Sequence, residues 1–135
     1  MRCAMEMVAN AITRKIEIEK TEILKHKIYL AKLRENTIAW CENIGVKMEN
    51  MVRQGKIPTY SFTMYGNYVM SANTKEYADH RVSWNKEIEL DLEIIAEWFG
   101  KYCFKVCKEE KGIWIYGCGY NKGFNVTIKP DPSCI

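Results

Sequence analysis

The chain of 135 residues is 47% hydrophobic and 27% charged, which is the balance of a globular protein and excludes a disordered one. Its net charge of +3 is too small to indicate a nucleic-acid partner by itself. No apolar run approaches the roughly eighteen residues of a membrane span, and the first ten residues lack the apolar core of a secretory signal. We therefore expect one cytoplasmic domain, residues 1–135, with no membrane partner.

The longest periodic segment runs from Val8 to Gln54 and predicts a long helix. Its apolar residues recur at steps of three, four or seven, which places them on one stripe. Gly55 follows as a C-cap. A break in the middle, where Asn36 or Thr37 would cap a second helix, makes a helical hairpin the alternative.

The apolar stripe on this helix predicts self-association. On a heptad that starts at Ala9, six of seven a positions are apolar but only three of six d positions are, so the seam is imperfect for a free two-stranded coil. An uninterrupted helix of this reach would be about 70 Å long, more than the remaining residues can cover. We therefore expect residues 8–54 to be a helical arm that forms a homo-oligomer, with a helix that only builds its own chain's core as the alternative. The predicted seam consists of Ile16, Ile23, Leu30, Leu33, Trp40 and Ile44.

Residues 59–132 predict an antiparallel sheet with one helix. The strands 60–65 and 68–71 flank a Gly-Asn turn and indicate a β-hairpin. A short strand is expected at 81–84, and Asp91 is expected to cap a short helix that ends at Gly100.

Three further strands are expected near the C-terminus. Residues 102–108, 113–116 and 124–129 carry the strand pattern, with turns predicted at 109–112 and 121–123. The expected fold is therefore α+β: a long N-terminal helix or helical hairpin, a β-hairpin, a short helix and a three-stranded antiparallel meander.

The six cysteines, at positions 3, 41, 103, 107, 118 and 134, form no Cys-x-x-Cys pair. Cys103 and Cys107 are expected on one strand face. Zinc ligands normally come in closely spaced pairs with a fourth ligand nearby, and disulfides belong to exported proteins. We therefore expect free thiols that pack as small hydrophobes, with no metal and no cofactor.

The residues around the predicted hairpin indicate a binding surface. Aromatic side chains are interleaved there with basic ones, an arrangement that stacks on a nucleobase and pairs with its phosphate or forms a protein-binding hot spot. Packing on the sheet face explains the same aromatics without a ligand. The predicted ligand- or partner-binding residues are Tyr65, Tyr68, Tyr77, His80, Arg81 and Trp84.

The sequence contains no known catalytic motif, and we expect a non-enzymatic, oligomeric binding protein that inhibits or sequesters a partner. In general character the chain resembles the small accessory proteins of bacteria and their phages, many of which act by binding and blocking. The concrete expectation is a phage-encoded inhibitor of a bacterial defence system that binds a protein or a small nucleotide signal.

Two alternatives remain open from the residues. Residues 1–58 carry 11 Lys and Arg against 7 Asp and Glu, which favours a nucleic-acid-binding regulator that uses this basic half. His80, between Asp79 and Arg81, would serve a small hydrolase.

Overall fold

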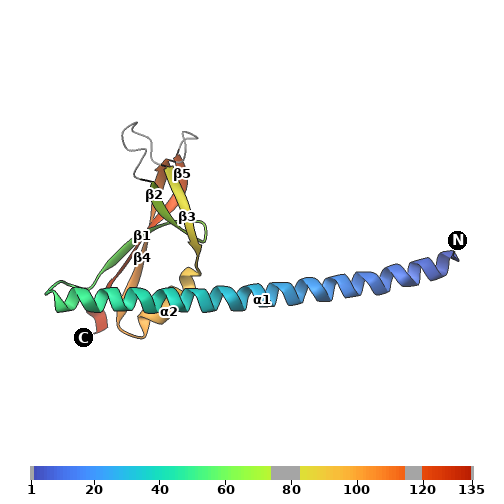
Figure 1. Cartoon of the computed structure of the whole chain (residues 1–135), viewed down its shortest axis with the longest axis horizontal. Coiled ribbons are helices and arrows are strands. Elements are labelled where there is room, and N and C mark those ends of the chain that lie inside the picture. Colours follow the sequence, from blue (N-terminus) through green and yellow to red (C-terminus); the bar gives the residue numbers. More distant parts are fainter. Residues whose placement is uncertain (1, 74–82, 115–119, 135) are drawn as a thin grey trace. The chain divides into compact units, whose positions relative to one another are not determined.

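The computed structural model describes residues 2–73, 83–114 and 120–134 (Figure 1). Two α-helices and a five-stranded antiparallel sheet confirm the α+β class. The chain divides into two compact units, Met1–Lys32 and Leu33–Ile135. The boundary falls within the first helix rather than at the end of the predicted arm, because residues 33 onwards pack with the sheet.

Helix α1 runs from Ala4 to Arg53, so the predicted long helix is confirmed and begins four residues before Val8. The helical-hairpin alternative is wrong, since the helix is unbroken at Asn36 and Thr37. Thr37 does not cap a second helix. Its Oγ1 instead donates to the carbonyl oxygen of Leu33 at 2.7 Å, a bond that a threonine within a helix can make.

The end of α1 follows from Gly55, as predicted. Its φ of +75° lies in the left-handed region that favours glycine. The backbone N–H of Gly55 donates to the carbonyl of Val52 at 3.0 Å, and that of Lys56 donates to the carbonyl of Met51 at 2.9 Å. These two bonds form a Schellman motif, which satisfies carbonyls that the end of a helix leaves without partners.

The strands of the sheet lie in the order β3-β2-β1-β5-β4, and each neighbouring pair is antiparallel. Their bounds are β1 Tyr60–Tyr65, β2 Tyr68–Asn73, β3 Ser83–Glu89, β4 Phe104–Trp114 and β5 Tyr120–Pro130. The predicted hairpin is confirmed as β1 and β2, joined by a turn in which Gly66 has a φ of +58°. The short strand expected at 81–84 is the beginning of the longer β3; residues 81 and 82 lie outside the described residues.

The predicted three-stranded meander is wrong, because the C-terminal region contains two long strands. The expected turns at 109–112 and 121–123 lie inside β4 and β5, where Glu110 pairs with Phe124 and Gly112 with Lys122. In the described residues the β1–β5 ladder stops at Phe124, so the strand residues beyond it pair in a two-stranded ribbon. Polar residues and glycine are compatible with such a ribbon, and in the sequence they resemble turns.

Helix α2 runs from Leu92 to Gly100, and Asp91 is its N-cap, as predicted. A carboxylate oxygen of Asp91 accepts a hydrogen bond from the backbone N–H of Glu93 at 3.0 Å. The strands and α2 lie beside the C-terminal part of α1 (teal to green in Figure 1).

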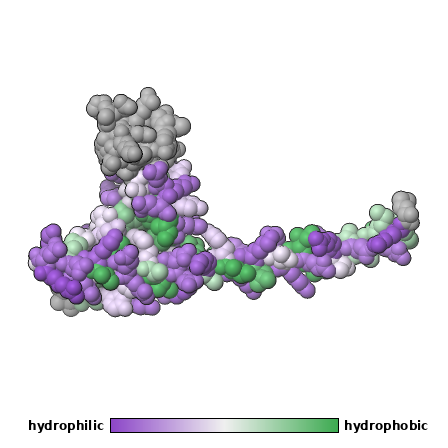
Figure 2. All heavy atoms as spheres, viewed as in Figure 1, coloured by the Kyte–Doolittle hydropathy of each residue, from purple (hydrophilic) through white to green (hydrophobic). Residues whose placement is uncertain are grey.

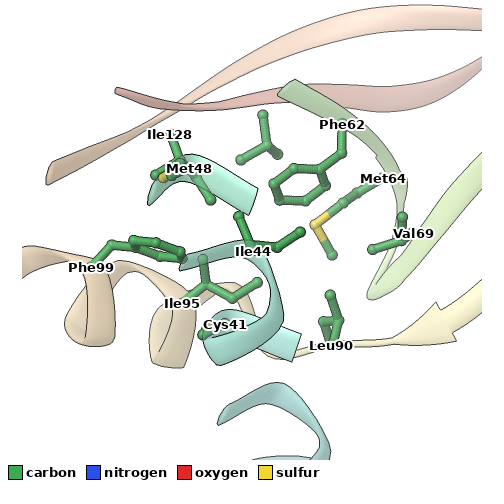
Figure 3. Close-up of a cluster of buried hydrophobic side chains, with 11 residues drawn as sticks. Cys41, Ile44, Met48, Phe62, Met64, Val69, Leu90, Ile95, Phe99 and Ile128 are labelled. Carbon is green, nitrogen blue, oxygen red and sulfur yellow. The ribbon is translucent and has the colours of Figure 1, made fainter. Parts of the chain in front are cut away.

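The hydrophobic core of the unit Leu33–Ile135 lies between α1, α2 and one face of the sheet. Residues at spacings of three and four on α1 supply one side of it, because that spacing keeps them on one helical face. Figure 3 shows side chains from α1, α2 and the strands pointing toward one another. The buried cluster consists of Cys41, Ile44, Met48, Phe62, Met64, Val69, Leu90, Ile95, Phe99, Val126 and Ile128.

Thr37 connects α1 to the start of α2. It is the one polar side chain that is buried among the described residues. Besides donating to Leu33, its Oγ1 accepts a hydrogen bond from the backbone N–H of Asp91 at 3.1 Å. The hydroxyl therefore satisfies a backbone donor at the residue that caps α2.

We predict that Thr37→Val destabilises the protein by about 1–3 kcal/mol, because valine has the same shape but leaves the Asp91 N–H without its acceptor. Urea unfolding followed by tryptophan fluorescence measures the loss. Thr21→Val is the matched control. Thr21 Oγ1 makes the same bond to the carbonyl of Glu17 at 2.9 Å but is exposed, so we expect a change within about 0.5 kcal/mol. Equal effects of the two substitutions would contradict the role assigned to Thr37.

Candidate functional site

A groove of about 350 Å³ lies between α1, α2 and the start of β4, within the unit Leu33–Ile135. Helix α1 lines it with Gly45, Val46 and Val52, and α2 and the residues after it contribute Trp98 and Tyr102. Val46, Val52 and Tyr102 are exposed to solvent, at 57%, 55% and 62%. The groove is therefore an open apolar surface rather than part of the core.

The groove forms because two neighbouring faces of α1 have different roles. Ile44 and Met48 point into the core. Gly45 and Val46, which lie between them in the sequence, face away from it on the neighbouring side of the helix. The indole ring of Trp98 packs beside Gly45. A Cβ at Gly45 would lie 3.5 Å from Cη2 of Trp98, which is ordinary contact distance.

Aromatic rings form the wall on the α2 side. The ring of Trp98 lies 4.8 Å from the ring of Phe99 in an edge-on arrangement and 5.0 Å from the ring of Tyr102. Ring pairs at these distances contribute about 0.5–1.5 kcal/mol beyond the area that they bury. Since Phe99 is in the core, these contacts fix the half-buried Trp98 against the body of the protein.

The electrostatic character of the groove is acidic. Its charged lining residues, among those the structure describes, are Glu42 and Glu49, which lie seven positions apart on α1 and are both exposed. Two full turns of a helix separate them, so both lie along the same side of the groove. An apolar surface with carboxylates beside it suits an apolar segment that carries a positive charge.

The unit Met1–Lys32 presents a second kind of surface. Every residue described in it is exposed, and Figure 2 shows hydrophobic residues (green) among hydrophilic ones (purple) along this helix. A helix in water gains most of its stability by packing an apolar face. The large exposed hydrophobic side chains in this unit are Met5, Met7, Val8, Ile12, Ile16, Ile18, Ile23, Leu24, Ile28, Tyr29 and Leu30.

Local ion pairs contribute little to this helix. Arg14 lies 3.4 Å from Glu17 and Lys25 lies 3.7 Å from Glu22, with both pairs exposed. Exposed pairs of this kind stabilise by about 0.2–1 kcal/mol. Burying one large apolar side chain contributes about 1.5–3 kcal/mol, so the uncovered side chains are the larger effect.

The six residues of the predicted seam have different environments. Ile16, Ile23 and Leu30 are exposed, Leu33 and Trp40 are half-buried, and Ile44 is 1% exposed. Ile44 lies in the core of its own chain and cannot reach a second copy. The interpretation of the stripe as core therefore fits residues 37–48, and a seam between copies stays a prediction for Ile16, Ile23 and Leu30.

The predicted ligand-binding residues fall partly within the described structure. Tyr65 and Tyr68 are cross-strand neighbours that flank the hairpin turn, and Nζ of Lys86 lies 4.7 Å from the ring centroid of Tyr68. Trp84 belongs to β3, where its backbone pairs with Ala72.

The remaining three predicted ligand-binding residues, Tyr77, His80 and Arg81, lie outside the described residues.

The expectation that the cysteines pack as small hydrophobes fits the buried Cys41 but is wrong for Cys3, Cys103 and Cys134, which are exposed. Cys103 precedes β4 and has a φ of +61°, so it does not share a strand face with Cys107. A hydrogen bond with Cys103 raises the pKa of the exposed Cys134 to about 11. Cys118 lies outside the described residues.

In the described ranges no group of three or more His, Cys, Asp or Glu side chains is arranged to hold a metal ion. No helix there has both the length and the apolar character to cross a membrane.

Comparison with known proteins found no match to a family model, to a curated protein or to a solved structure. The groove is therefore described by its own residues. The sequence analysis did not predict this groove, because it predicted for residues 91–100 only a short helix. The signals that were present are the carboxylates at 42 and 49 on either side of Val46, and aromatics at 98 and 102.

We predict that Cys41 resists alkylation in the native protein. Burial, with a smaller contribution from the charge of Glu42, raises the pKa of its thiol to about 12, so at about pH 8 only about one thiol in ten thousand is the reactive thiolate. Mass spectrometry after iodoacetamide treatment should show Cys41 reacting at least about a hundredfold more slowly than the exposed Cys3. In denaturant the two rates should converge. Similar native rates would mean that the core around α1 opens readily.

Proposed function

We propose that this chain is a non-enzymatic binding protein that holds an apolar, positively charged segment of a partner protein in the groove between α1 and α2. The observation that carries the proposal is the open apolar groove with an aromatic wall and two carboxylates at its side. Blocking of the partner, which the sequence leads us to expect, would follow from covering that segment.

The size and lining of the groove support this occupant. A volume of about 350 Å³ is at the small end of the roughly 300–1,000 Å³ of ligand sites. One or two large apolar side chains fit such a space. Tryptophan and tyrosine are the residues most often found at the energetic centre of protein interfaces, because they combine a large apolar area with little conformational freedom.

The charge of the groove favours a protein segment over a nucleotide. Glu42 and Glu49 repel phosphate, and both attract lysine or arginine. We therefore do not expect a nucleotide to bind in this groove. The aromatic-basic surface that the sequence predicts for a nucleotide is represented in the described structure by Tyr68 and Lys86.

We predict that a random-peptide display selection on the protein enriches sequences with large apolar residues next to Lys or Arg, and that Gly45→Leu abolishes their binding. A leucine there would project into the space beside Trp98. Ala39→Leu is the matched control, because Ala39 is exposed on α1 and does not line the groove. Fluorescence polarisation with a selected peptide measures both variants.

The charge contribution is tested with the same peptide. Glu42→Gln with Glu49→Gln should weaken binding about three- to tenfold at low salt, since each exposed pair contributes modestly. Glu109→Gln with Glu110→Gln changes the net charge equally on exposed residues of β4 and should leave binding unchanged. Selected peptides that bind Gly45→Leu as well as the parent protein would refute the groove as the site.

A further inference from the structure

The unit Met1–Lys32 carries an apolar stripe that is exposed along all of its described residues. Five of its exposed residues, Met5, Ile12, Ile16, Ile23 and Leu30, fall on the a and d positions of one heptad repeat. We propose that a second copy of this chain covers this stripe in an antiparallel helix pair whose midpoint falls between Glu17 and Ile18. The pairing is independent of the groove and of its occupant.

The length of the uncovered helix fits this midpoint. The helical part of the unit runs from Ala4 to Lys32, which is about four heptads and enough for a stable coiled coil. A midpoint between Glu17 and Ile18 lies close to its centre. The two helices then overlap along their whole length and end before Leu33, where α1 begins to pack on its own chain.

The antiparallel direction matches large apolar residues with each other. When one helix is reversed, each a position faces a d position of the other copy. With this midpoint, Ile23 faces Ile12 of the second copy and Leu30 faces Met5 of the second copy. Each contact occurs twice because the pair is symmetric.

The polar residues on the stripe also favour the antiparallel direction. Glu19 and His26 occupy d positions. In a parallel pair in register, Glu19 would face Glu19 and His26 would face His26, which brings like charges together. In the antiparallel pair Glu19 faces Ile16 and His26 faces Ala9, so neither faces its own equivalent.

Every pair of opposed charges on the flanks is attractive in this arrangement. An antiparallel pair brings g positions against g and e positions against e. Lys15 then faces Glu22 of the second copy, and Glu6 faces Lys27 of the second copy, which gives four attractive contacts. Glu22 already lies 3.7 Å from Lys25 of its own chain, but that exposed pair is weak.

Other arrangements lose this complementarity. A parallel pair places g against the e position five residues later, so Lys15 would face Lys20 twice and Glu22 would face Lys27 twice, and the repulsion offsets the attraction. Shifting the antiparallel pair by one heptad places Lys15 opposite Lys15 in one direction and Glu22 opposite Glu22 in the other. Both faults are absent from the proposed register.

The first test separates the stripe from the rest of the helix surface. Ile23→Glu with Leu30→Glu should convert the parent dimer into a monomer in size-exclusion chromatography with light scattering. Leu24→Glu with Ile28→Glu is the matched control, since these side chains are equally exposed, at 58% and 61%, but lie off the stripe. That variant should remain a dimer. A monomeric parent protein, or a control that also dissociates, would overturn the proposal.

The second test determines direction. Lys15→Glu and Glu22→Lys should each weaken the dimer about ten- to thirtyfold at low salt, because two attractive contacts become repulsive. An equimolar mixture of the two variants should form a heterodimer, since every contact between them is again attractive. Arg14→Glu and Glu17→Lys make the same charge changes off the flanks and should leave the dimer unchanged.

Two results would contradict the antiparallel pair. In a parallel pair Lys15→Glu would remove the repulsion from Lys20 and strengthen the dimer, which sedimentation equilibrium would detect. A mixture of Lys15→Glu and Glu22→Lys that does not associate would also refute the antiparallel register. Because these experiments use no groove ligand, their failure would leave the proposed function untouched.

Discussion

The structure depends on the packing of one face of α1 against the sheet and α2. The buried cluster joins Cys41, Ile44 and Met48 on that face to residues from three strands, from α2 and from the segment before it. A five-stranded twisted sheet with one short helix of nine residues cannot cover its own apolar face. The C-terminal part of α1 completes that layer, and Thr37 satisfies the backbone where α1 passes the start of α2.

The groove is a consequence of this packing. Once Ile44 and Met48 point into the core, the helical period places Gly45 and Val46 at the edge of the contact between α1 and α2. The indole of Trp98 packs beside Gly45, and its contacts with Phe99 and Tyr102 hold it there. The same rigid core that stabilises the unit therefore presents an apolar, acidic surface to solvent.

The N-terminal part of the same helix differs in that its apolar side chains are exposed. Its apolar residues continue the heptad of the core-facing residues, but in the unit Met1–Lys32 they have no cover. Helices without tertiary packing are marginal in water, which is the physical basis for proposing a second copy that covers them. The flanking charges support that proposal, because Lys15 with Glu22 and Glu6 with Lys27 are complementary to a reversed copy of themselves.

The sequence by itself determined the elements whose signals are local. The period of the apolar residues defined α1, Gly55 and Asp91 marked a helix end and a helix start, and Gly-Asn defined the hairpin. These signals depend on backbone geometry and on neighbours a few residues away, so they can be read without the fold.

Only the tertiary structure decided the rest, because it depends on residues that are distant in the chain. When each is considered by itself, the polar segments 109–112 and 121–123 resemble turns. In the structure they are strand residues, because the two segments pair with each other. Ile16 and Ile44 occupy the same heptad position, and only the packing of residues after 33 makes one exposed and the other core. The groove likewise exists only where Gly45 and Trp98 meet, fifty-three positions apart in the sequence.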